Sequence, residues 1–135
     1  MSVVKGERGE SNLSFLYKAR ELHKYTIQKC VGFPKRYTFY VGQPLADLAT
    51  EVHLETKKAN GIYPKNKKEA QLRRNHLLEA RASLQAIVAQ IELASDLFDI
   101  ESKTKLYWMS LVDEEIKLLS GVLESDKTRF KNLPD

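Results

Sequence analysis

Cysteine is nearly absent from this 135-residue sequence, and its apolar residues never form a long run. The single cysteine, Cys30, provides neither a disulfide within the chain nor a pair of thiolates for zinc, so we expect it to be a small buried apolar residue. No run reaches the roughly eighteen apolar residues that a membrane-spanning helix needs. Residues 1–12 also lack the apolar middle segment of a secretory signal. These absences predict a protein of the cytoplasm with no part in the membrane.

The sequence motifs of common catalytic and cofactor sites are missing as well. There is no Gly-x-x-x-x-Gly-Lys phosphate loop, no Gly-x-Gly-x-x-Gly turn and no Gly-x-Ser-x-Gly nucleophile motif. Four-helix proteins that hold two metal ions carry Glu-x-x-His motifs. Here the residues three positions before His23, His53 and His76 are Arg20, Thr50 and Arg73. The sequence therefore predicts no metal site, no cofactor and no catalytic centre.

Two acidic residues fall on or beside the inner faces of predicted helices. Glu55 continues the apolar series of one helix, and Glu115 lies between Val112 and Leu119 of another. Two carboxylates that face each other across a core can do acid–base chemistry. More often, an acid at such a position lies at the edge of the apolar stripe, with its head in water or paired to a base. We expect that second, structural role here.

The net charge of the chain is +4, and it is spread unevenly. Residues 61–81 contain six Lys or Arg and two Asp or Glu, whereas residues 82–135 contain six and ten. A basic region followed by an acidic one gives the protein an oriented electric field. Two interpretations stay open: the charges solvate helix faces, or the basic region binds an anionic partner, nucleic acid above all.

The clearest pattern is a long amphipathic stretch over residues 66–100. Its apolar residues recur at alternating steps of three and four, which lines one face of an α-helix. They are Leu77, Ala80, Leu84, Ile87, Ile91, Ala94 and Phe98. No Gly or Pro lies between Lys65 and Lys103 to break the helix. We therefore expect one helix over 67–98 that buries this face.

Three further helices are predicted, over 13–31, 40–60 and 102–126. Because short connections join them, neighbouring helices are expected to be antiparallel. The predicted fold class is all-α, an up-down-up-down antiparallel four-helix bundle that occupies residues 13–126. Residues 1–12 are expected to be a disordered segment, and residues 127–135 a C-terminal tail.

The start of the second helix is ambiguous around Pro44. Thr38 has a side chain that can cap a helix, but Pro44 would then kink that helix. Alternatively, the helix starts near Gly42 and has Pro44 in its first turn, where proline is tolerated. The sequence leaves both possibilities open.

Seven basic residues make up the candidate nucleic-acid-binding site. Three of them, Lys67, Arg74 and Arg81, are seven residues apart and share one stripe of the long helix. Arginines beside an apolar face either fork onto phosphates or pair with acids of a neighbouring helix or subunit, and both roles stay open. The full set is Lys35, Arg36, Lys67, Lys68, Arg73, Arg74 and Arg81.

Lys35 and Arg36 lie among aromatic residues in the turn after the first helix. A mixture of basic and aromatic side chains suits nucleic acid, because bases stack on the rings while the cations contact phosphates. In the alternative interpretation, Phe33, Tyr37 and Phe39 fasten the turn onto the end of the bundle.

The long helix also carries apolar residues outside its main face. They are Leu72, Leu78 and Val88. A helix in a monomeric bundle covers one stripe, so additional apolar surface favours a partner. We expect a homo-oligomer.

Two motifs resemble those of a known family. The turn Phe33–Phe39 reads Phe-Pro-Lys-Arg-Tyr-Thr-Phe and is followed by Gly42-Gln43, and the second predicted helix ends in Lys57-Lys58-Ala59-Asn60. Together with the order of the four helices, they resemble the bacterial four-helix-bundle family of ribosomal-RNA intervening-sequence proteins. This family includes the accessory variability determinant (Avd) of diversity-generating retroelements. The resemblance covers roughly residues 13–123, and Pro44 departs from the helix-forming residue expected at its position.

The resemblance implies a function as well as a fold. Avd-type members are non-enzymatic, form a pentamer of four-helix bundles, bind nucleic acid and associate with the reverse transcriptase of the retroelement. By position, Lys67, Arg74 and Arg81 are the implied contacts to RNA or DNA, with no dependence on sequence. Many members of the family lie outside any retroelement. The alternative function is therefore an oligomeric protein–protein adaptor of the same fold with no nucleic-acid role.

Overall fold

A computed structural model of the chain describes the backbone of residues 2–135 and the side chains of residues 13–135. Within that part there are four α-helices and no β-strand, so the predicted all-α fold with four helices is confirmed. The helices are α1 (Ser2–Cys30), α2 (Gln43–Asn60), α3 (Lys67–Leu97) and α4 (Ser102–Arg129). The predicted disorder of residues 1–12 falls where side chains lie outside this description, and it stays a prediction.

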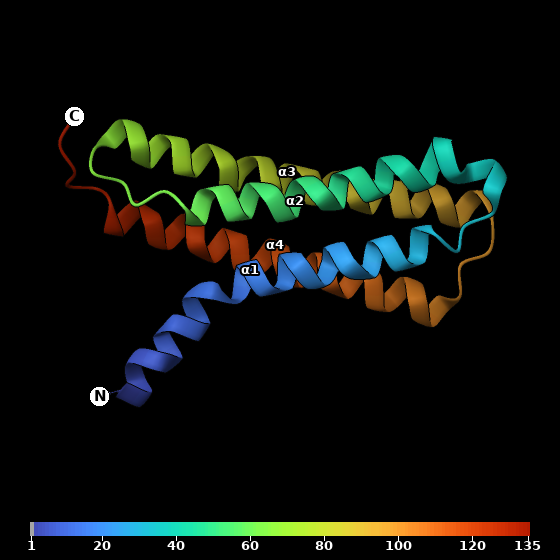
Figure 1. Cartoon of the computed structure of the whole chain (residues 1–135), viewed down its shortest axis with the longest axis horizontal. Helices are drawn as coiled ribbons and strands as arrows, with labels where there is room; N and C mark the ends of the chain where they lie inside the picture. Colours follow the sequence, from blue (N-terminus) through green and yellow to red (C-terminus); the bar gives the residue numbers. More distant parts are fainter. Residues whose placement is uncertain (1) are drawn as a thin grey trace.

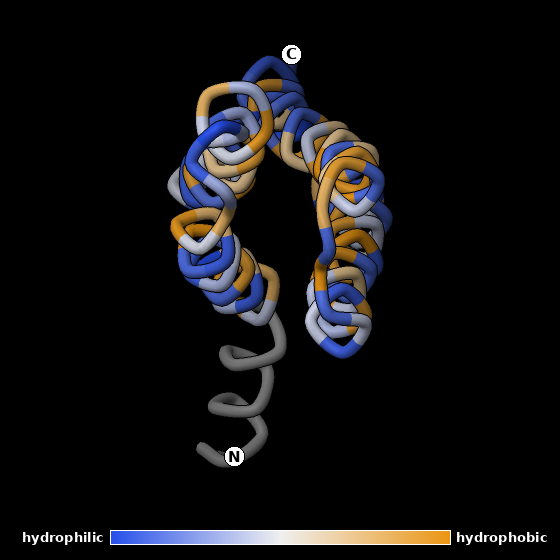
Figure 2. The backbone as a smooth tube through the Cα atoms, turned by 90° about the vertical axis from the view of Figure 1, so that its right-hand side faces the viewer, coloured by the Kyte–Doolittle hydropathy of each residue, from blue (hydrophilic) through white to orange (hydrophobic). Residues whose placement is uncertain are grey.

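The four helices lie side by side along the longest axis of the molecule (Figure 1). Each packs against two others, because α1 and α3 both contact α2 and α4. The α1–α2 and α3–α4 connections lie at one end, which we call the α1–α2 end. The α2–α3 connection and the C-terminus lie at the opposite end, the α2–α3 end. Viewed along their length, the helices surround a common interior (Figure 2).

Apolar side chains from all four helices fill this interior. On α3, Leu84, Ile87 and Ile91 are fully buried, as the spacing of apolar residues predicts. The ring N–H of buried Trp108 on α4 donates to the hydroxyl of Thr26 on α1 across 2.9 Å. A buried donor without a partner costs about 1–3 kcal/mol, so this bond lets the bulky indole occupy the core. The cluster around them contains Phe15, Ala19, Leu22, Leu45, Ala49, Val52, Leu77, Ala80, Leu111, Val112 and Leu119.

The α3 helix begins where a side chain can satisfy its free N–H groups. The Asn66 side-chain oxygen accepts from the N–H of Glu69 at 2.8 Å, and the Glu69 carboxylate accepts from the N–H of Lys65 at 2.9 Å. Such reciprocal capping fixes the first turn of a helix. The helix then runs without a break to Leu97, within one residue of the predicted end.

The α2 helix begins at Gln43 and has Pro44 in its first turn, which confirms the second of the two predicted starts. Residues Thr38–Gly42 form a π-helical turn that leads into it, after a short 3₁₀ turn over Lys35–Tyr37. No side chain caps either turn. Thr38 is therefore not the side-chain cap of α2, although its carbonyl accepts from the N–H of Gln43, the residue before Pro44.

Two aromatic rings fasten this turn onto the end of the bundle. Phe33 meets the ring of Phe98 edge-on at a centroid distance of 4.8 Å, and Tyr37 stacks on the same ring at 5.2 Å. Phe39 does not take part, because its side chain is 79% exposed. The prediction that aromatic residues fasten the turn onto the bundle is thus confirmed for Phe33 and Tyr37 and is wrong for Phe39.

The apolar residues outside the main face of α3 differ in their surroundings. Leu72 is half exposed, whereas Leu78 and Val88 are partly buried and pack against the core. The additional surface on α3 is therefore smaller than the sequence predicts. Among the described residues, no helix combines the length and the apolar character needed to cross a membrane.

Candidate nucleic-acid interface

The seven predicted basic residues do not form one site. Lys67, Lys68 and Arg74 lie in the first turns of α3, at the α2–α3 end of the molecule. Lys35 and Arg36 lie in the connection between α1 and α2, at the opposite end (Figure 1). A phosphate that contacts the basic residues at one end of the bundle is far from the basic residues at the other end. The two groups are therefore separate candidates.

Arg73 lies inside the protein and is the exception on α3. Its side chain is only 8% exposed, and its Nε donates to Asp126 Oδ2 on α4 at 2.7 Å. One terminal nitrogen donates to the carbonyl of Ala59 at the end of α2 at 2.9 Å. Arg73 thus ties α2, α3 and α4 together. Because its donors are engaged with these groups, Arg73 is not part of the basic surface.

Arg81 also contacts a neighbouring helix. Its Nη1 donates to the Ser120 hydroxyl of α4 at 3.3 Å, and its side chain is partly buried. Of the two roles that the sequence leaves open for Arg81, this contact favours attachment to a neighbouring helix. The partner is a hydroxyl and not an acid, and within the described residues no acid pairs with the positive charge of Arg81.

A basic groove lies between the start of α3 and the end of α4. It has a volume of about 430 Å³, and four cations line it: Lys67, Arg74, Lys127 and Lys131. The chain after α4 turns back towards α3, where the N–H of Lys67 donates to the carbonyl of Pro134 at 2.9 Å. This turn places Lys131 beside α3, whereas Lys127 reaches the groove from the last turn of α4. The sequence assigns both lysines to a tail, and only their separation of four residues, about one helical turn, indicates a shared surface.

Acidic groups compensate only part of the basic groove. Lys67 approaches Asp135 at 3.4 Å, and Lys127 approaches Glu124 at 3.4 Å, and both are exposed pairs that contribute little. Within the described part of the chain, Arg74 and Lys131 have no acidic partner. The groove therefore presents two cations whose donors are free for an anionic ligand.

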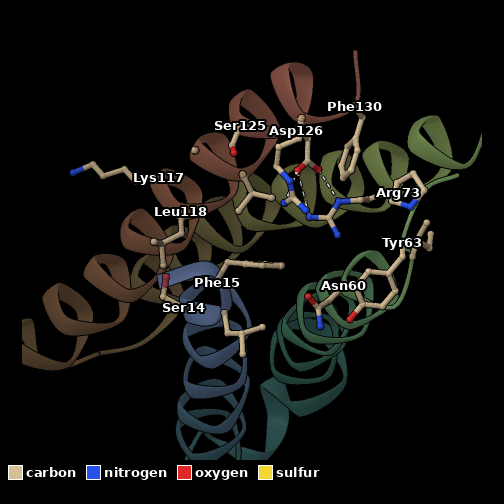
Figure 3. Close-up of a pocket in the computed structure, with 16 residues that line it drawn as sticks. Ser14, Phe15, Asn60, Tyr63, Arg73, Lys117, Leu118, Ser125, Asp126 and Phe130 are labelled. Atoms are coloured by element: carbon tan, nitrogen blue, oxygen red, sulfur yellow. Dashed lines mark hydrogen bonds and ion pairs between the residues drawn. The ribbon is translucent and has the colours of Figure 1, made fainter. Parts of the chain in front are cut away.

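A second pocket lies on the other side of Asp126 and Phe130, and polar and apolar groups line it in about equal measure. We call it the apolar pocket after the Leu13, Phe15 and Leu118 side chains in its wall. It has a volume of about 660 Å³ and opens between the start of α1, the α2–α3 connection and the end of α4. Figure 3 shows Tyr63 and Asn60 across this apolar pocket from Leu118 and Ser125. The Arg73–Asp126 ion pair lies between these two sides.

Gly121 lies inside α4 and leaves open space at the wall of the apolar pocket. A Cβ atom built there meets nothing within 4 Å, and the backbone φ is not positive. Glycine inside a helix costs about 1 kcal/mol relative to alanine. We expect Gly121→Ala to raise the free energy of unfolding by about that amount, as measured by urea denaturation. A lower unfolding midpoint in the variant would contradict this placement of Gly121.

The two acids singled out from the sequence lie in different surroundings. Glu55 contacts His76 and Lys58. Burial alone raises the pKa of Glu55, but its hydrogen bonds and charge interactions with His76 and Lys58 lower it overall. Glu115 is fully buried, and neither of its carboxylate oxygens has a hydrogen-bond partner among the described residues. Burial raises the pKa of Glu115 to about 9, against a weaker effect of the Lys18 charge. Neither acid lines the basic groove or the apolar pocket.

A pair of histidines joins α1 to α2, and nothing in the sequence indicates it. His23 Nδ1 lies 2.8 Å from His53 Nδ1, and His23 Nε2 lies 2.9 Å from the hydroxyl of Thr50. That hydroxyl donates to the carbonyl of Ala46, so it accepts from His23. His23 Nδ1 must then accept from His53. Both ring nitrogens of His23 are thereby engaged, which leaves it no lone pair for a metal ion.

The surroundings of the histidine pair agree with this structural role. Burial lowers the pKa of both His23 and His53. No group of three or more His, Cys, Asp or Glu side chains in the described residues is placed to hold a metal ion. Burial likewise raises the pKa of the Cys30 thiol to about 12, so this cysteine is the buried apolar residue that the sequence predicts.

Comparisons of the chain with protein-family models, with curated proteins and with solved structures found no match. The resemblance to the intervening-sequence and Avd-type proteins therefore stays a prediction from the sequence motifs. The function has to be inferred from the geometry of the site.

Proposed function

We propose that this protein is a non-enzymatic accessory protein that binds nucleic acid through the basic groove. The observation that carries the proposal is the convergence of four cations from α3 and the end of α4, two of which lack an acidic partner in the described part of the chain. Polyanions are the ligands that such a surface attracts. Phosphate contacts from Lys and Arg provide most of the affinity of sequence-independent nucleic-acid binding.

The composition of the α2–α3 end supports the same function. Residues 57–74 contain seven Lys or Arg and one acid, Glu69. Glu69 is occupied in capping α3 and does not compensate the groove. The positive charge of this end attracts a phosphate backbone over a distance of about 8 Å at physiological salt. RNA and DNA both satisfy this chemistry.

The motif resemblance extends the proposal to assembly and to a protein partner. We propose an up-down-up-down antiparallel bundle in the cytoplasm, supported by the alternation of the connections between the two ends of the molecule. The resemblance to Avd supports a homo-oligomer, a pentamer, and association with a retroelement reverse transcriptase. Arg81 remains a candidate contact because no acid among the described residues pairs with its charge. In an oligomer, several basic grooves would bind one nucleic acid with increased avidity.

Charge reversal at the two unpaired cations tests the basic groove. We expect the double variant Arg74→Glu, Lys131→Glu to bind duplex and single-stranded oligonucleotides roughly tenfold more weakly or worse, because two phosphate contacts become repulsive. The variant should also flatten the slope of log affinity against log salt, by about 0.9 for each phosphate contact that it removes from a duplex. A filter-binding titration at several salt concentrations measures both effects.

The matched control reverses two cations elsewhere. Lys24 on α1 and Lys103 on α4 are exposed and lie outside the groove, and within the described residues neither has an ion-pair partner. The variant Lys24→Glu, Lys103→Glu changes the net charge equally. If it weakens binding as much as the groove variant, the effect comes from net charge and the groove is not the site. If the parent protein binds neither kind of oligonucleotide at low salt, the proposed function is wrong.

A protein–protein adaptor is the second candidate function, and one observation favours it. The α1–α2 end exposes large apolar side chains: Val31, Phe39 and Tyr40 are each 79% exposed, and Leu106 is 71% exposed. Exposed apolar groups gathered at one end of a helical bundle are typical of an interface with another protein. This end also carries Lys35 and Arg36. The adaptor function predicts no nucleic-acid binding in the filter assay.

A further inference from the structure

The apolar pocket and the basic groove are neighbours, because Asp126 and Phe130 line both of them. We propose that the two together bind single-stranded nucleic acid, with phosphates in the groove and one unstacked base in the pocket. This inference rests on the proposed nucleic-acid function and adds the kind of strand that is bound. It also assigns a role to the apolar pocket.

Cations lie on both sides of the apolar pocket, as a continuous phosphate backbone requires. Arg74 and Lys131 line the groove on one side. Lys117 and Arg129 line the pocket itself, and the side chain of Arg129 is 57% exposed. The acids near these two residues are Asp113, in an exposed pair, and Asp126, which is already paired with Arg73. A backbone that enters through the groove therefore meets further cations at the wall of the pocket.

An exposed aromatic ring provides the stacking surface for the base. Tyr63 in the α2–α3 connection is 81% exposed, and it makes no ring contact or hydrogen bond within the described residues. Phe130 is less available, since the guanidinium groups of Arg73 and Arg129 lie over its ring at 5.8 and 4.8 Å. Stacking on tyrosine is tolerant of base identity, because every base has an aromatic face.

Two uncharged polar side chains are placed to contact the edge of the base. The Asn60 amide and the Ser125 hydroxyl line the pocket from opposite sides, and neither has a hydrogen-bond partner in the part of the chain that the structure describes (Figure 3). An amide offers a donor and an acceptor, and a hydroxyl offers both as well. Such groups satisfy purine and pyrimidine edges alike, which again predicts little dependence on sequence.

The pocket discriminates between strand types by access. Its volume of about 660 Å³ is within the range of small-molecule sites and accommodates one base. A base in a duplex is paired and stacked, and it reaches a pocket only by flipping out of the helix. A base in a single strand is free to enter. Single strands should therefore gain affinity from the pocket that duplexes and abasic strands do not.

Binding of the full chain to four labelled probes of equal length tests this inference. The probes are poly(dT), poly(U), an abasic single strand and a duplex, and fluorescence anisotropy at low salt gives their affinities. We expect poly(dT) and poly(U) to bind about tenfold more tightly than the abasic strand. In the Tyr63→Ala and Gly121→Leu variants, the affinities for poly(dT) and poly(U) should both fall to the affinity for the abasic strand. Tyr40→Ala removes a tyrosine that is similarly exposed at the opposite end of the molecule, and it should behave like the parent.

The outcomes separate this inference from the proposed function. If the parent binds all four probes equally, the pocket takes no base and the inference is overturned, while the proposed function survives. If the parent binds none of them, the proposed function itself fails. If Tyr63→Ala or Gly121→Leu weakens the abasic strand as much as poly(dT), the inference is also overturned. A changed oligomeric state of Gly121→Leu in size-exclusion chromatography, with parental strand affinity, would overturn it too and show that a second copy covers the pocket.

Discussion

Arg73→Ala is expected to lower the free energy of unfolding by about 3–5 kcal/mol, the effect of removing one partner from a buried ion pair. The substitution leaves the carboxylate of Asp126 buried, with only the exposed side chain of Arg129 3.7 Å away. It also removes the donor to the Ala59 carbonyl. Since Arg73 joins three helices, the loss should affect the whole bundle. Urea denaturation followed by circular dichroism measures it.

Two further variants distinguish this explanation from a loss of packing volume. Arg129→Ala removes the exposed cation beside the same Asp126 and should cost less than about 1 kcal/mol. The double variant Arg73→Met, Asp126→Leu removes both charges and keeps apolar volume, so it should recover most of the stability lost in Arg73→Ala. If the double variant is as unstable as Arg73→Ala, the unpaired buried charge is not the cause.

Glu115→Gln is expected to raise the free energy of unfolding by about 3 kcal/mol at pH 7. The reason is that the carboxyl of Glu115 must take up a proton when the protein folds and buries it. The pKa of Glu115 is about 9 in the folded state, against an ordinary value of 4.5. Between these two values the folded state binds one more proton than the unfolded state. Stability is therefore fully present below pH 4.5 and is lost progressively as the pH rises to about 9. Glutamine has nearly the same shape and does not titrate.

The pH dependence is the sharper readout for Glu115. Parent and Glu115→Gln should have similar unfolding midpoints near pH 4.5, and the difference should grow with rising pH. Glu92→Gln is the control, because Glu92 is an exposed acid of α3. It should follow the parent at every pH. Equal slopes of stability against pH for parent and Glu115→Gln would show that the carboxyl of Glu115 is hydrated and ionised.

The fold was largely predictable because it depends on periodicity, which is a local property. The alternating steps of three and four from Leu77 to Ala94 mark one face of a helix, and those residues are buried. The start of α3 is marked in the sequence by Pro64, which lies just before the helix, and by Asn66, whose side chain caps it. The start of α2 was ambiguous, since a π-helical turn before Pro44 has no simple sequence pattern.

The candidate site was less predictable because it depends on which helices meet. Arg73 and Arg74 are adjacent in the sequence and have the same charge, yet one is buried against Asp126 and the other lines the basic groove. Neighbouring residues of a helix point in directions about 100° apart. The position of α4 therefore determines which of the two arginines is buried. Lys131 enters the groove only because the chain after α4 turns back to Lys67, and Lys127 enters it only because the end of α4 lies beside the start of α3. Pairwise interactions of this kind leave no periodic trace.

The length of α3 sets the distance between the two ends of the molecule. Its 31 residues span about 46 Å at 1.5 Å per residue, and this length separates the basic groove at the α2–α3 end from the exposed apolar side chains at the α1–α2 end. Charges that far apart are screened from each other in physiological salt, where the Debye length is about 8 Å. Ligands on the two ends would not touch. If nucleic acid binds at the α2–α3 end as proposed, the bundle is a rigid spacer, and a ligand at the α1–α2 end should leave the dissociation constant of the nucleic acid unchanged.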